Sequence, residues 1–361
     1  MSFSFNFDVP KQIVNPDFTR EKEGHNEKKD NAATSVSNKQ VNTTPSEPVK
    51  EAKEYLPVPD LQFLLLDAVT ETVTIGTLPP LQFLNETVFE KTSSEREDDE
   101  KILSRTAEQR SDLISGVYEG GLKVWECTYD LLELIDRDGE TFEGKTVLDL
   151  GCGSGLLGIL ALKRRASNVH FQDYNSTVIE ELTVPNVILN LQDDDDEESE
   201  VERKKGTGKG KKQEEDGTTK TSTDKCEEKS ESPPPKKRAN DLSQNPLLTK
   251  CRFFSGDWST FLPLVLSSDP PIRYDIILTS ETIYNTAYYP ALHETLHKLL
   301  APEGLVYLAT KSHYFGVGGG LHLFETYVEQ RGIFSVQHVW DGDEGLQRHV
   351  VILRFLKPKD T

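Results

Sequence analysis

The sequence has few cysteines and no long apolar stretch. Its four cysteines, at positions 127, 152, 226 and 251, stand far apart, and none belongs to a C-x-x-C pair. This spacing argues against a disulfide framework and a zinc knuckle, and it favours reduced, intracellular thiols. No window approaches the ~18 apolar residues of a membrane span. The first residues lack the basic and apolar parts of a signal peptide, so we expect neither feature.

Basic residues are also in deficit. Lys and Arg number 41 against 61 Asp and Glu, which gives a net charge of −20. A general nucleic-acid-binding protein presents a basic face, so we expect no direct sequence-specific binding to nucleic acid. The acids are unevenly spread, and the balance over the whole chain therefore says little about any one face.

Two polar blocks divide the chain. Residues 1–54 carry too few apolar positions to form a core, and we interpret them as a disordered N-terminal region. Residues 55–110 are expected to be an extension that packs on the domain that follows, residues 111–361. Residues 191–247 are acidic, then rich in Lys and Gly, then rich in Pro. We interpret this second block as a disordered insertion looped out of the domain.

The insertion contains a short basic cluster after a proline run. In SPPPKKRAN, three prolines precede Lys236, Lys237 and Arg238. An exposed basic triplet is accessible to a nuclear import receptor, which would make it a nuclear localisation signal. The alternative is a solvated charge cluster that offsets the neighbouring acids, and three charges do not discriminate between the two.

Outside the polar blocks, apolar strands alternate with amphipathic helices, which predicts a parallel sheet covered on both faces. The clearest helix carries Leu292, Leu296 and Leu299 on one face. The last two candidate strands have no helix between them, so we expect a hairpin that contributes one antiparallel strand. The prediction is a Rossmann-like α/β sheet of seven strands, at residues 146–151, 169–174, 251–256, 274–280, 305–310, 334–340 and 350–356.

The most informative stretch is VLDLGCGSGLLG, residues 147–158, in which a strand meets a glycine-rich turn and then a helix. This arrangement lets the backbone approach a ligand that faces the helix N-terminus. The spacing of Gly151, Gly153 and Gly155 is not G-x-G-x-x-G, because position 156 is leucine. No Gly-Lys-Ser/Thr follows, which excludes a phosphate loop.

Two acidic residues near this turn indicate which kind of ligand it binds. Asp149 lies just before the turn, and Asp173 ends the next strand in FQDYN. A carboxylate at the second position can accept hydrogen bonds from both hydroxyls of a ribose. Together with the seven strands, these acids favour S-adenosylmethionine over a nicotinamide cofactor.

The sequence resembles the seven-β-strand S-adenosylmethionine methyltransferases, and most closely the protein-histidine methyltransferases that modify a large-subunit ribosomal protein. The resemblance covers about residues 111–190 and 248–356, and its most specific parts are GLKVWECT, SETIY and HYFGVGGG. It implies methyl transfer from S-adenosylmethionine to a histidine of a ribosomal protein. It also implies a monomeric enzyme of the nucleus, nucleolus and cytoplasm that affects ribosome biogenesis or translation.

The resemblance also implies roles for individual residues. Trp125 shields the sulfonium at the start of a helix, and Glu281 and Tyr284 lie next to the acceptor as candidate catalytic residues. His313 and Tyr314 belong to the substrate cleft. Core packing is the alternative for Trp125 and Tyr284, and a strand-end position for His313. The implied cofactor site comprises Val124, Trp125, Glu126, Cys127, Thr128, Asp149, Gly151, Gly153, Gln172, Asp173, Tyr174, Asn175, Gly256, Asp257, Trp258 and Ser280.

Two further motifs compete with this interpretation. The glycine run at 316–320 resembles a second phosphate cradle, but we interpret it as a flexible rim of the substrate cleft. HETLH, from His293 to His297, fits the H-E-x-x-H pattern of zinc peptidases. The extended pattern fails, because positions 300 and 303 are Leu and Glu, and we expect no metal site. A protein-lysine methyltransferase of the same fold and a non-catalytic scaffold for ribosome assembly also fit the sequence.

Overall fold

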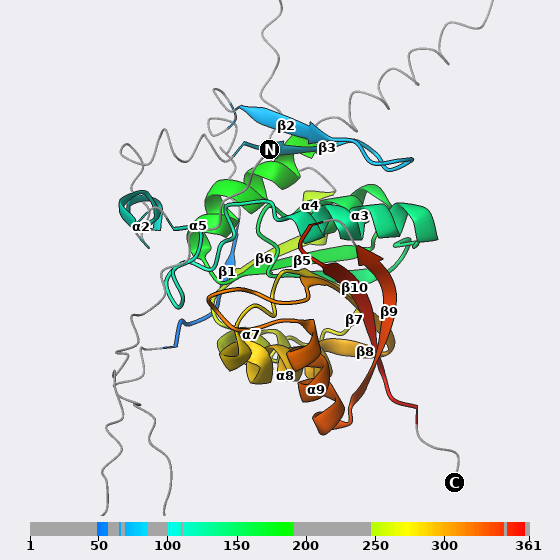
Figure 1. The fold of residues 1–361 in the computed structure, drawn as a ribbon. Coiled ribbons are helices and arrows are strands. Elements are labelled where there is room, and N and C mark those ends of the chain that lie inside the picture. Colours follow the sequence, from blue (N-terminus) through cyan, green and yellow to red (C-terminus); the bar gives the residue numbers. More distant parts are fainter. Residues whose placement is uncertain are drawn as a thin grey trace, which may run out of the picture.

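A computed structural model describes residues 49–56, 65, 69–85, 100, 102–109, 111–190, 247–342 and 345–357. These residues form an α/β fold around one eight-stranded sheet with the order β1-β6-β5-β4-β7-β8-β10-β9 (Figure 1). Strands β6, β5, β4, β7 and β8 run parallel to one another. Their bounds are β6 Cys251–Ser255, β5 Asn168–Asp173, β4 Thr146–Leu150, β7 Tyr274–Ser280 and β8 Leu300–Lys311.

Antiparallel pairing occurs near both edges of the sheet. β10 (Arg348–Phe355) pairs antiparallel with β8 and with β9 (Phe334–Gly342), as the predicted hairpin requires. At the opposite edge β1 (Lys53–Tyr55) pairs antiparallel with β6. The prediction of seven strands is therefore wrong, and residues 53 and 54 are ordered although we expected disorder there. The segment Lys-Glu-Tyr lacks the alternation of apolar and polar residues that predicts a strand. It is extended because it pairs with the open edge of β6.

Helices cover both faces of the sheet, as predicted, and each layer has its own apolar core (Figure 1). Val147 of β4 points into one core and Leu148 into the other. One layer holds α3 (Glu126–Asp138), α4 (Leu156–Lys163), α5 (Ser176–Val178) and a π-helical turn (Ile179–Thr183) that continues as helix over 184–190. The other holds α7 (Trp258–Leu266), α8 (Tyr289–Leu299) and α9 (Leu321–Arg331). Further short elements are α2 (Ile102–Gln109) and the 3-10 turns Leu248–Lys250 and Thr286–Tyr288.

Within residues 55–110, the segment 69–85 packs on the outer side of the α4 layer (Figure 1). Its strands β2 (Thr70–Val73) and β3 (Leu81–Leu84) form a separate antiparallel pair. The backbone N–H groups of Gln82 and Leu84 donate to the side-chain oxygens of Asn190 and Asn186, at 2.9 and 2.8 Å. Two helical asparagines thus satisfy the free edge of β3, which an extra strand would otherwise pair.

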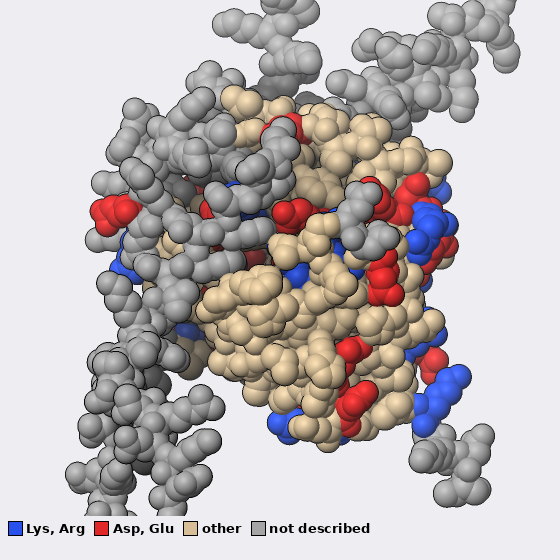
Figure 2. All heavy atoms as spheres, in the orientation of Figure 1, with Lys and Arg blue, Asp and Glu red and all other residues tan. Residues whose placement is uncertain are grey.

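The surface shows no concentration of one charge sign on the face of Figure 2. Lys and Arg lie among Asp and Glu along the right-hand edge, and the area over α8 is mostly uncharged. Within the described ranges, no helix is both long and apolar enough to cross a membrane. The basic triplet 236–238 and all of the insertion except Leu247 lie outside the described residues.

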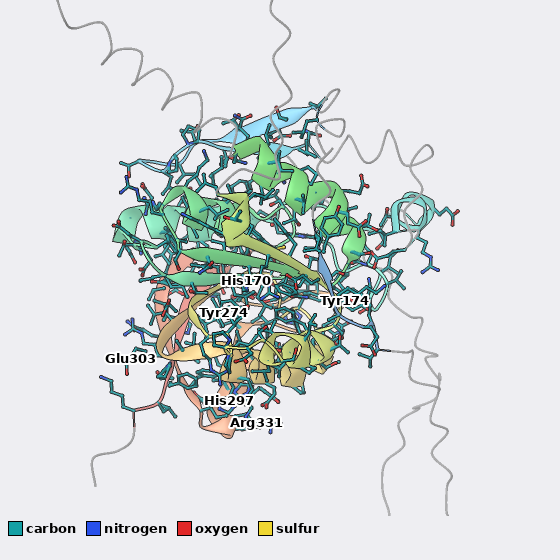
Figure 3. The ribbon with its side chains drawn as sticks, turned by 180° about the vertical axis from the view of Figure 1, so that it is seen from behind. His170, Tyr174, Tyr274, His297, Glu303 and Arg331 are labelled. Atoms are coloured by element: carbon teal, nitrogen blue, oxygen red, sulfur yellow. The ribbon has the colours of Figure 1, made fainter. Side chains whose placement is uncertain are left out.

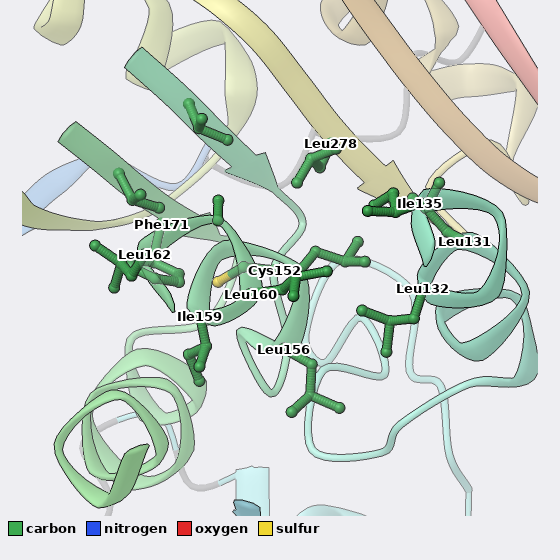
Figure 4. Close-up of a cluster of buried hydrophobic side chains, with 14 of the residues drawn as sticks. Leu131, Leu132, Ile135, Cys152, Leu156, Ile159, Leu160, Leu162, Phe171 and Leu278 are labelled. Atoms are coloured by element: carbon green, nitrogen blue, oxygen red, sulfur yellow. The ribbon is translucent and has the colours of Figure 1, made fainter. Parts of the chain in front are cut away.

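A buried polar pair links two strands on either side of β4. His170 of β5 and Tyr274 of β7 point toward one another, and Nδ1 of His170 lies 2.8 Å from the Tyr274 hydroxyl (Figure 3). Burial lowers the pKa of His170 to about 4, so this imidazole is neutral at physiological pH. On the α3 and α4 side, Leu131, Leu160 and Phe171 belong to a large cluster of buried apolar side chains (Figure 4).

Candidate active site

The strand order reverses at β4: the chain runs from β4 through β5 to β6 on one side, and then returns to β7 on the other. Ligands of open α/β sheets bind beyond the carboxyl ends of the strands at such a point. A cavity of about 240 Å³ lies there. The predicted site residues that line it are Val124, Trp125, Thr128, Asp149, Gly151, Gly153, Asp173, Tyr174, Gly256, Asp257, Trp258, Ser280, Glu281, Tyr284 and Tyr314.

The glycine turn after β4 forms the floor of the cavity and fits a ligand that approaches the backbone closely. Gly151 and Gly153 have φ angles of +68° and +50°, which side chains rarely adopt. A Cβ on Gly151 would lie 2.6 Å from Cγ2 of Thr282, and one on Gly153 would lie 3.0 Å from the carbonyl oxygen of Gly121. Any side chain here would therefore distort the turn that the ligand contacts.

Two buried aspartic acid side chains fix the shape of this turn. Oδ2 of Asp149 accepts from the N–H of Gly158 at 2.9 Å, inside the first turn of α4. Oδ2 of Asp173 accepts from the N–H of Gly153 at 3.0 Å, and Oδ1 accepts from the N–H of Asn175 at 3.1 Å. Burial raises the pKa of Asp149 to about 8 and that of Asp173 to about 6. Each Asp173 oxygen has a further lone pair, so the carboxylate can still accept from a ribose hydroxyl.

The start of α3 forms the opposite wall. Trp125 precedes the helix, and its indole N–H donates to the carbonyl of Gly120 at 3.0 Å. One helical turn on, the Thr128 hydroxyl donates to Ser280 at 3.1 Å, which joins α3 to the end of β7. The predicted shielding tryptophan therefore lines the cavity in a fixed orientation, and it is not an ordinary core residue.

Three predicted cofactor residues lie behind the cavity wall. Gln172 is fully buried: its amide N–H donates to the carbonyl of Gly256, and its oxygen accepts from the indole of Trp258, both at 2.9 Å. Asn175 is also fully buried, and it donates to the carbonyl of Val117 at 2.8 Å. Cys127 is buried in the α3 core, where burial raises its pKa far above the usual range. These side chains position the wall; they do not line the cavity.

Glu126 and His313 are likewise absent from the described lining of the cavity. Glu126 reaches Lys311, at 3.2 Å, and His313 is exposed and packs edge-on against Phe315 at a ring distance of 4.9 Å. The glycine run beyond His313 supports the site through its backbone. The N–H of Gly319 donates to the carbonyl of Tyr284 at 2.8 Å, with no room for a Cβ between them.

Lys311, which was not predicted from the sequence, sits at the end of β8 and lines the cavity. Its ammonium lies 3.2 Å from Oε2 of Glu126 and 3.2 Å from Oε1 of Glu281, with 6% of the side chain exposed. Burial lowers the pKa of Lys311, but the carboxylates of Glu281 and Glu126 outweigh burial and raise it. A single lysine at a strand end gives no sequence signal for such a pairing.

Glu281 has an unusual backbone conformation. Its φ is +59°, in the left-handed region that non-glycine residues seldom occupy. Its N–H donates to the carbonyl of Ala309 at 2.9 Å, which ties this conformation to β8. Such backbone strain is concentrated at functional sites, where it directs a side chain to a place that a relaxed strand would not reach.

A second residue that was not predicted, Glu119, organises the tyrosines of the cavity. Its carboxylate accepts from the hydroxyls of Tyr284 and Tyr288 and from the N–H of Gly116. Burial raises the pKa of Glu119, and burial together with Glu119 raises that of Tyr284 well above its usual range. The Tyr284 hydroxyl is therefore protonated, and its hydrogen is directed at Glu119. Its lone pairs remain available to accept a hydrogen bond from a group in the cavity.

The HETLH histidines belong to the apolar packing under α8. His293 packs edge-on against Phe334 at a ring distance of 5.4 Å, and His297 packs against Phe355 at 6.1 Å. Figure 3 places His297 in this helical layer, and neither histidine is among the residues that line the cavity. The structure therefore gives the motif a packing role.

Comparisons with known proteins agree with this geometry. A family model described as a methyltransferase domain matches residues 126–338. Histidine protein methyltransferase 1 homologs are 46% identical over 312 residues in Bos taurus and 44% identical over 312 residues in Mus musculus. These matches cover 86% of this chain, with 74% of the Bos taurus and 76% of the Mus musculus protein. Histidine protein methyltransferase 1 of Saccharomyces cerevisiae is 29% identical over 286 residues, covering 70% of this chain and 68% of that protein. The chain therefore belongs to the histidine protein methyltransferase family, whose methyl donor is S-adenosylmethionine.

Proposed function

We propose that this enzyme transfers a methyl group from S-adenosylmethionine to a ring nitrogen of a histidine in a protein substrate. The main observation in favour of histidine as the acceptor is that the cavity wall presents hydrogen-bond acceptors. Tyr284 donates to Glu119 and so presents lone pairs to the cavity, and the Glu281 carboxylate beside it is an acceptor. A neutral imidazole complements such a wall, because it has one N–H to donate and one lone pair to attack.

The residues present fit the methyl donor. Asp173, Tyr174 and Trp258 would hold its ribose and adenine, and Trp125 and the glycine turn would hold its methionine end. The bound donor supplies a methyl group that is already activated on a sulfonium. The protein therefore needs to orient the acceptor and exclude water, and it does not need to create a strong nucleophile.

Glu281 and Tyr284 orient the acceptor. When either accepts the imidazole N–H, the opposite ring nitrogen keeps its lone pair, and the tautomer is fixed. Lys311 holds the Glu281 carboxylate in place, and the positive φ of residue 281 directs it to the cavity. Mass spectrometry of the residue methylated in a cell lysate, with isotopically labelled methyl donor, tests the acceptor directly; a methylated lysine would contradict the proposal.

The substrate that we propose is a large-subunit ribosomal protein, and the site of action is the nucleus and nucleolus as well as the cytoplasm. The motif resemblance supports the ribosomal substrate, and the basic triplet Lys236, Lys237 and Arg238 supports nuclear import. Isolated large ribosomal subunits from cells lacking the enzyme should accept label from the purified protein, whereas small subunits should not.

Replacing Asp173 with alanine is expected to weaken S-adenosylhomocysteine binding by about 10- to 150-fold. The change removes a charged acceptor for the ribose, worth about 1.5–3 kcal/mol. Isothermal titration calorimetry measures the difference, and Asp138→Ala, an exposed acid at the far end of α3, is the matched control. Unchanged affinity in Asp173→Ala would place the ribose elsewhere. Absence of binding in the wild-type protein would favour a non-catalytic scaffold.

Deleting residues 193–245, with a short Gly/Ser linker joining the ends, is expected to leave cofactor affinity unchanged. The cavity lining that the structure describes comes from residues 113–174 and 256–317, on either side of this segment. The same deletion should shift a fluorescently tagged protein toward the cytoplasm. Replacing the triplet 236–238 by alanines should reproduce the shift, and replacing Lys204 and Lys205 should not. Loss of folding on deletion would show that the insertion is structural.

A further inference from the structure

A cluster of potential metal ligands lies on the β9–β10 hairpin, outside the methyl-transfer cavity. Asp341 of β9 pairs directly with His349 of β10, and His338 pairs with Val351. Between these pairs, Trp340 faces Val350 and residue 339 is an extra residue on β9. Without the bulge, positions 338 and 341 would point to opposite faces; with it, His338, Asp341 and His349 share one face.

The three side chains converge on one point. Oδ1 of Asp341 lies 2.6 Å from Nδ1 of His349 and 3.4 Å from Nδ1 of His338. The ligand atoms of these three side chains all lie within 4.8 Å of one another. Among the residues that the structure describes, no other group of three or more His, Cys, Asp or Glu side chains meets this condition. His349 is largely buried, with 17% of its side chain exposed, whereas Asp341 is open to solvent.

The outer nitrogen of each imidazole already has a partner. Nε2 of His338 lies 2.6 Å from Oε1 of Glu325 on α9, which can only accept, so Nε2 carries the hydrogen. Nε2 of His349 lies 2.5 Å from the Ser312 hydroxyl, which in turn lies 3.3 Å from Oε1 of Gln347. Nδ1 of each ring therefore faces the Asp341 carboxylate. Because Nε2 of each ring has a partner of its own, Nδ1 of the two rings and the Asp341 carboxylate are the atoms that can share one cation.

We propose that His338, Asp341 and His349 bind a divalent transition-metal ion, with Zn²⁺ as the representative, and that water completes the coordination. Two imidazoles and one carboxylate suit zinc, copper or nickel better than magnesium or calcium. Tetrahedral zinc with N and O ligands at about 2.0–2.2 Å places those ligands about 3.4 Å apart. The His338–Asp341 distance matches this value, and the His349–Asp341 distance needs to open by under about 1 Å.

The second partners of the histidines support this assignment. Ligating histidines usually donate their other N–H to a carboxylate or another oxygen, and Glu325 and Ser312 occupy those places. The carboxylates of Asp341 and Glu325 also balance the two charges of the ion. Bound metal would tie β9 and β10 to α9 through Glu325 and to the end of β8 through Ser312. It would stabilise this edge of the sheet without taking part in methyl transfer.

Calorimetric titration of the full chain with ZnCl₂ tests the proposal, in a Cys226→Ser background that removes a competing thiol. We expect saturable binding of one ion and a rise in Tm. His338→Ala and His349→Ala should each weaken binding by at least tenfold, and Glu325→Gln by about 10- to 100-fold. His322→Ala, an exposed histidine on α9, should bind like the parent protein.

Circular dichroism and S-adenosylhomocysteine binding establish that each variant is folded, since the methyl-transfer cavity lies elsewhere. Equal zinc binding in the parent and in the His338→Ala/His349→Ala double variant would overturn the proposal. So would the absence of saturable binding in the parent, which would mean that protons on the two imidazoles supply the positive charge.

Discussion

Replacing Glu281 with glutamine is expected to lower kcat by about 100-fold or more, with cofactor affinity within about threefold of the wild type. Glutamine keeps the size of the side chain but replaces one of the two oxygens by an N–H₂ group. With its remaining oxygen turned toward Lys311, it presents to the acceptor an N–H₂ group that cannot accept the imidazole N–H. Its amide also removes the charge that Lys311 pairs at 3.2 Å. Single-turnover methylation of a histidine peptide, together with calorimetry of S-adenosylhomocysteine, separates the two effects. Glu133→Gln, an exposed residue of α3, is the matched control.

The pH profile of the same reaction identifies the acceptor. A histidine acceptor has a reference pKa of about 6.5, so kcat at saturating cofactor should be flat above pH ~7 and fall below pH ~6. A lysine acceptor would give a rate that still climbs at pH ~9, because its reference pKa is about 10.4. Protonation of Asp173, whose pKa burial raises to about 6, should appear in the KM for the cofactor. In the Glu281→Gln experiment, a kcat equal to that of the wild type would show that Glu281 has no role in methyl transfer.

Replacing Lys311 with methionine is expected to destabilise the protein by about 3 kcal/mol. The substitution fills the same space but leaves the carboxylates of Glu126 and Glu281 without their cation, and Glu281 is 8% exposed. For a domain of this size the loss corresponds to a fall in Tm of roughly 6–12 °C. Differential scanning calorimetry of the ligand-free protein at pH 7 measures it.

Three variants show whether the buried charges are the cause. Lys311→Arg should keep most of the stability, because the positive charge remains. Adding Glu281→Gln to Lys311→Met should recover part of the loss, because one unpaired carboxylate disappears. Lys145→Met breaks a partly exposed pair with Glu140 and should cost no more than about 1 kcal/mol. If Lys311→Met lowers the free energy of unfolding no more than Lys145→Met does, the carboxylates of Glu126 and Glu281 do not need Lys311 for their burial.

The sequence by itself determined the parts of this protein that depend on local backbone geometry and on the period of apolar residues. Alternating strands and helices established the parallel sheet. The glycines at 151 and 153 marked a turn with positive φ angles, and the structure has them there. Asp149 and Asp173 were identifiable because a parallel sheet brings the carboxyl ends of neighbouring strands to the same edge. These features need only residues that are close in the chain, or the general rules of one fold.

Tertiary structure alone decided which distant side chains meet. β1 forms because β6 has an open edge with which it can pair. Lys311 forms ion pairs with Glu126 and Glu281 because the fold brings α3 and the ends of β7 and β8 together. Gln172 and Asn175 lie in the motif that predicts the cofactor site. Their side-chain amides donate to backbone carbonyls of neighbouring loops, however, and therefore do not line the cavity. Such contacts depend on strand pairing, bulges and packing between segments far apart in the chain, and no local pattern specifies them.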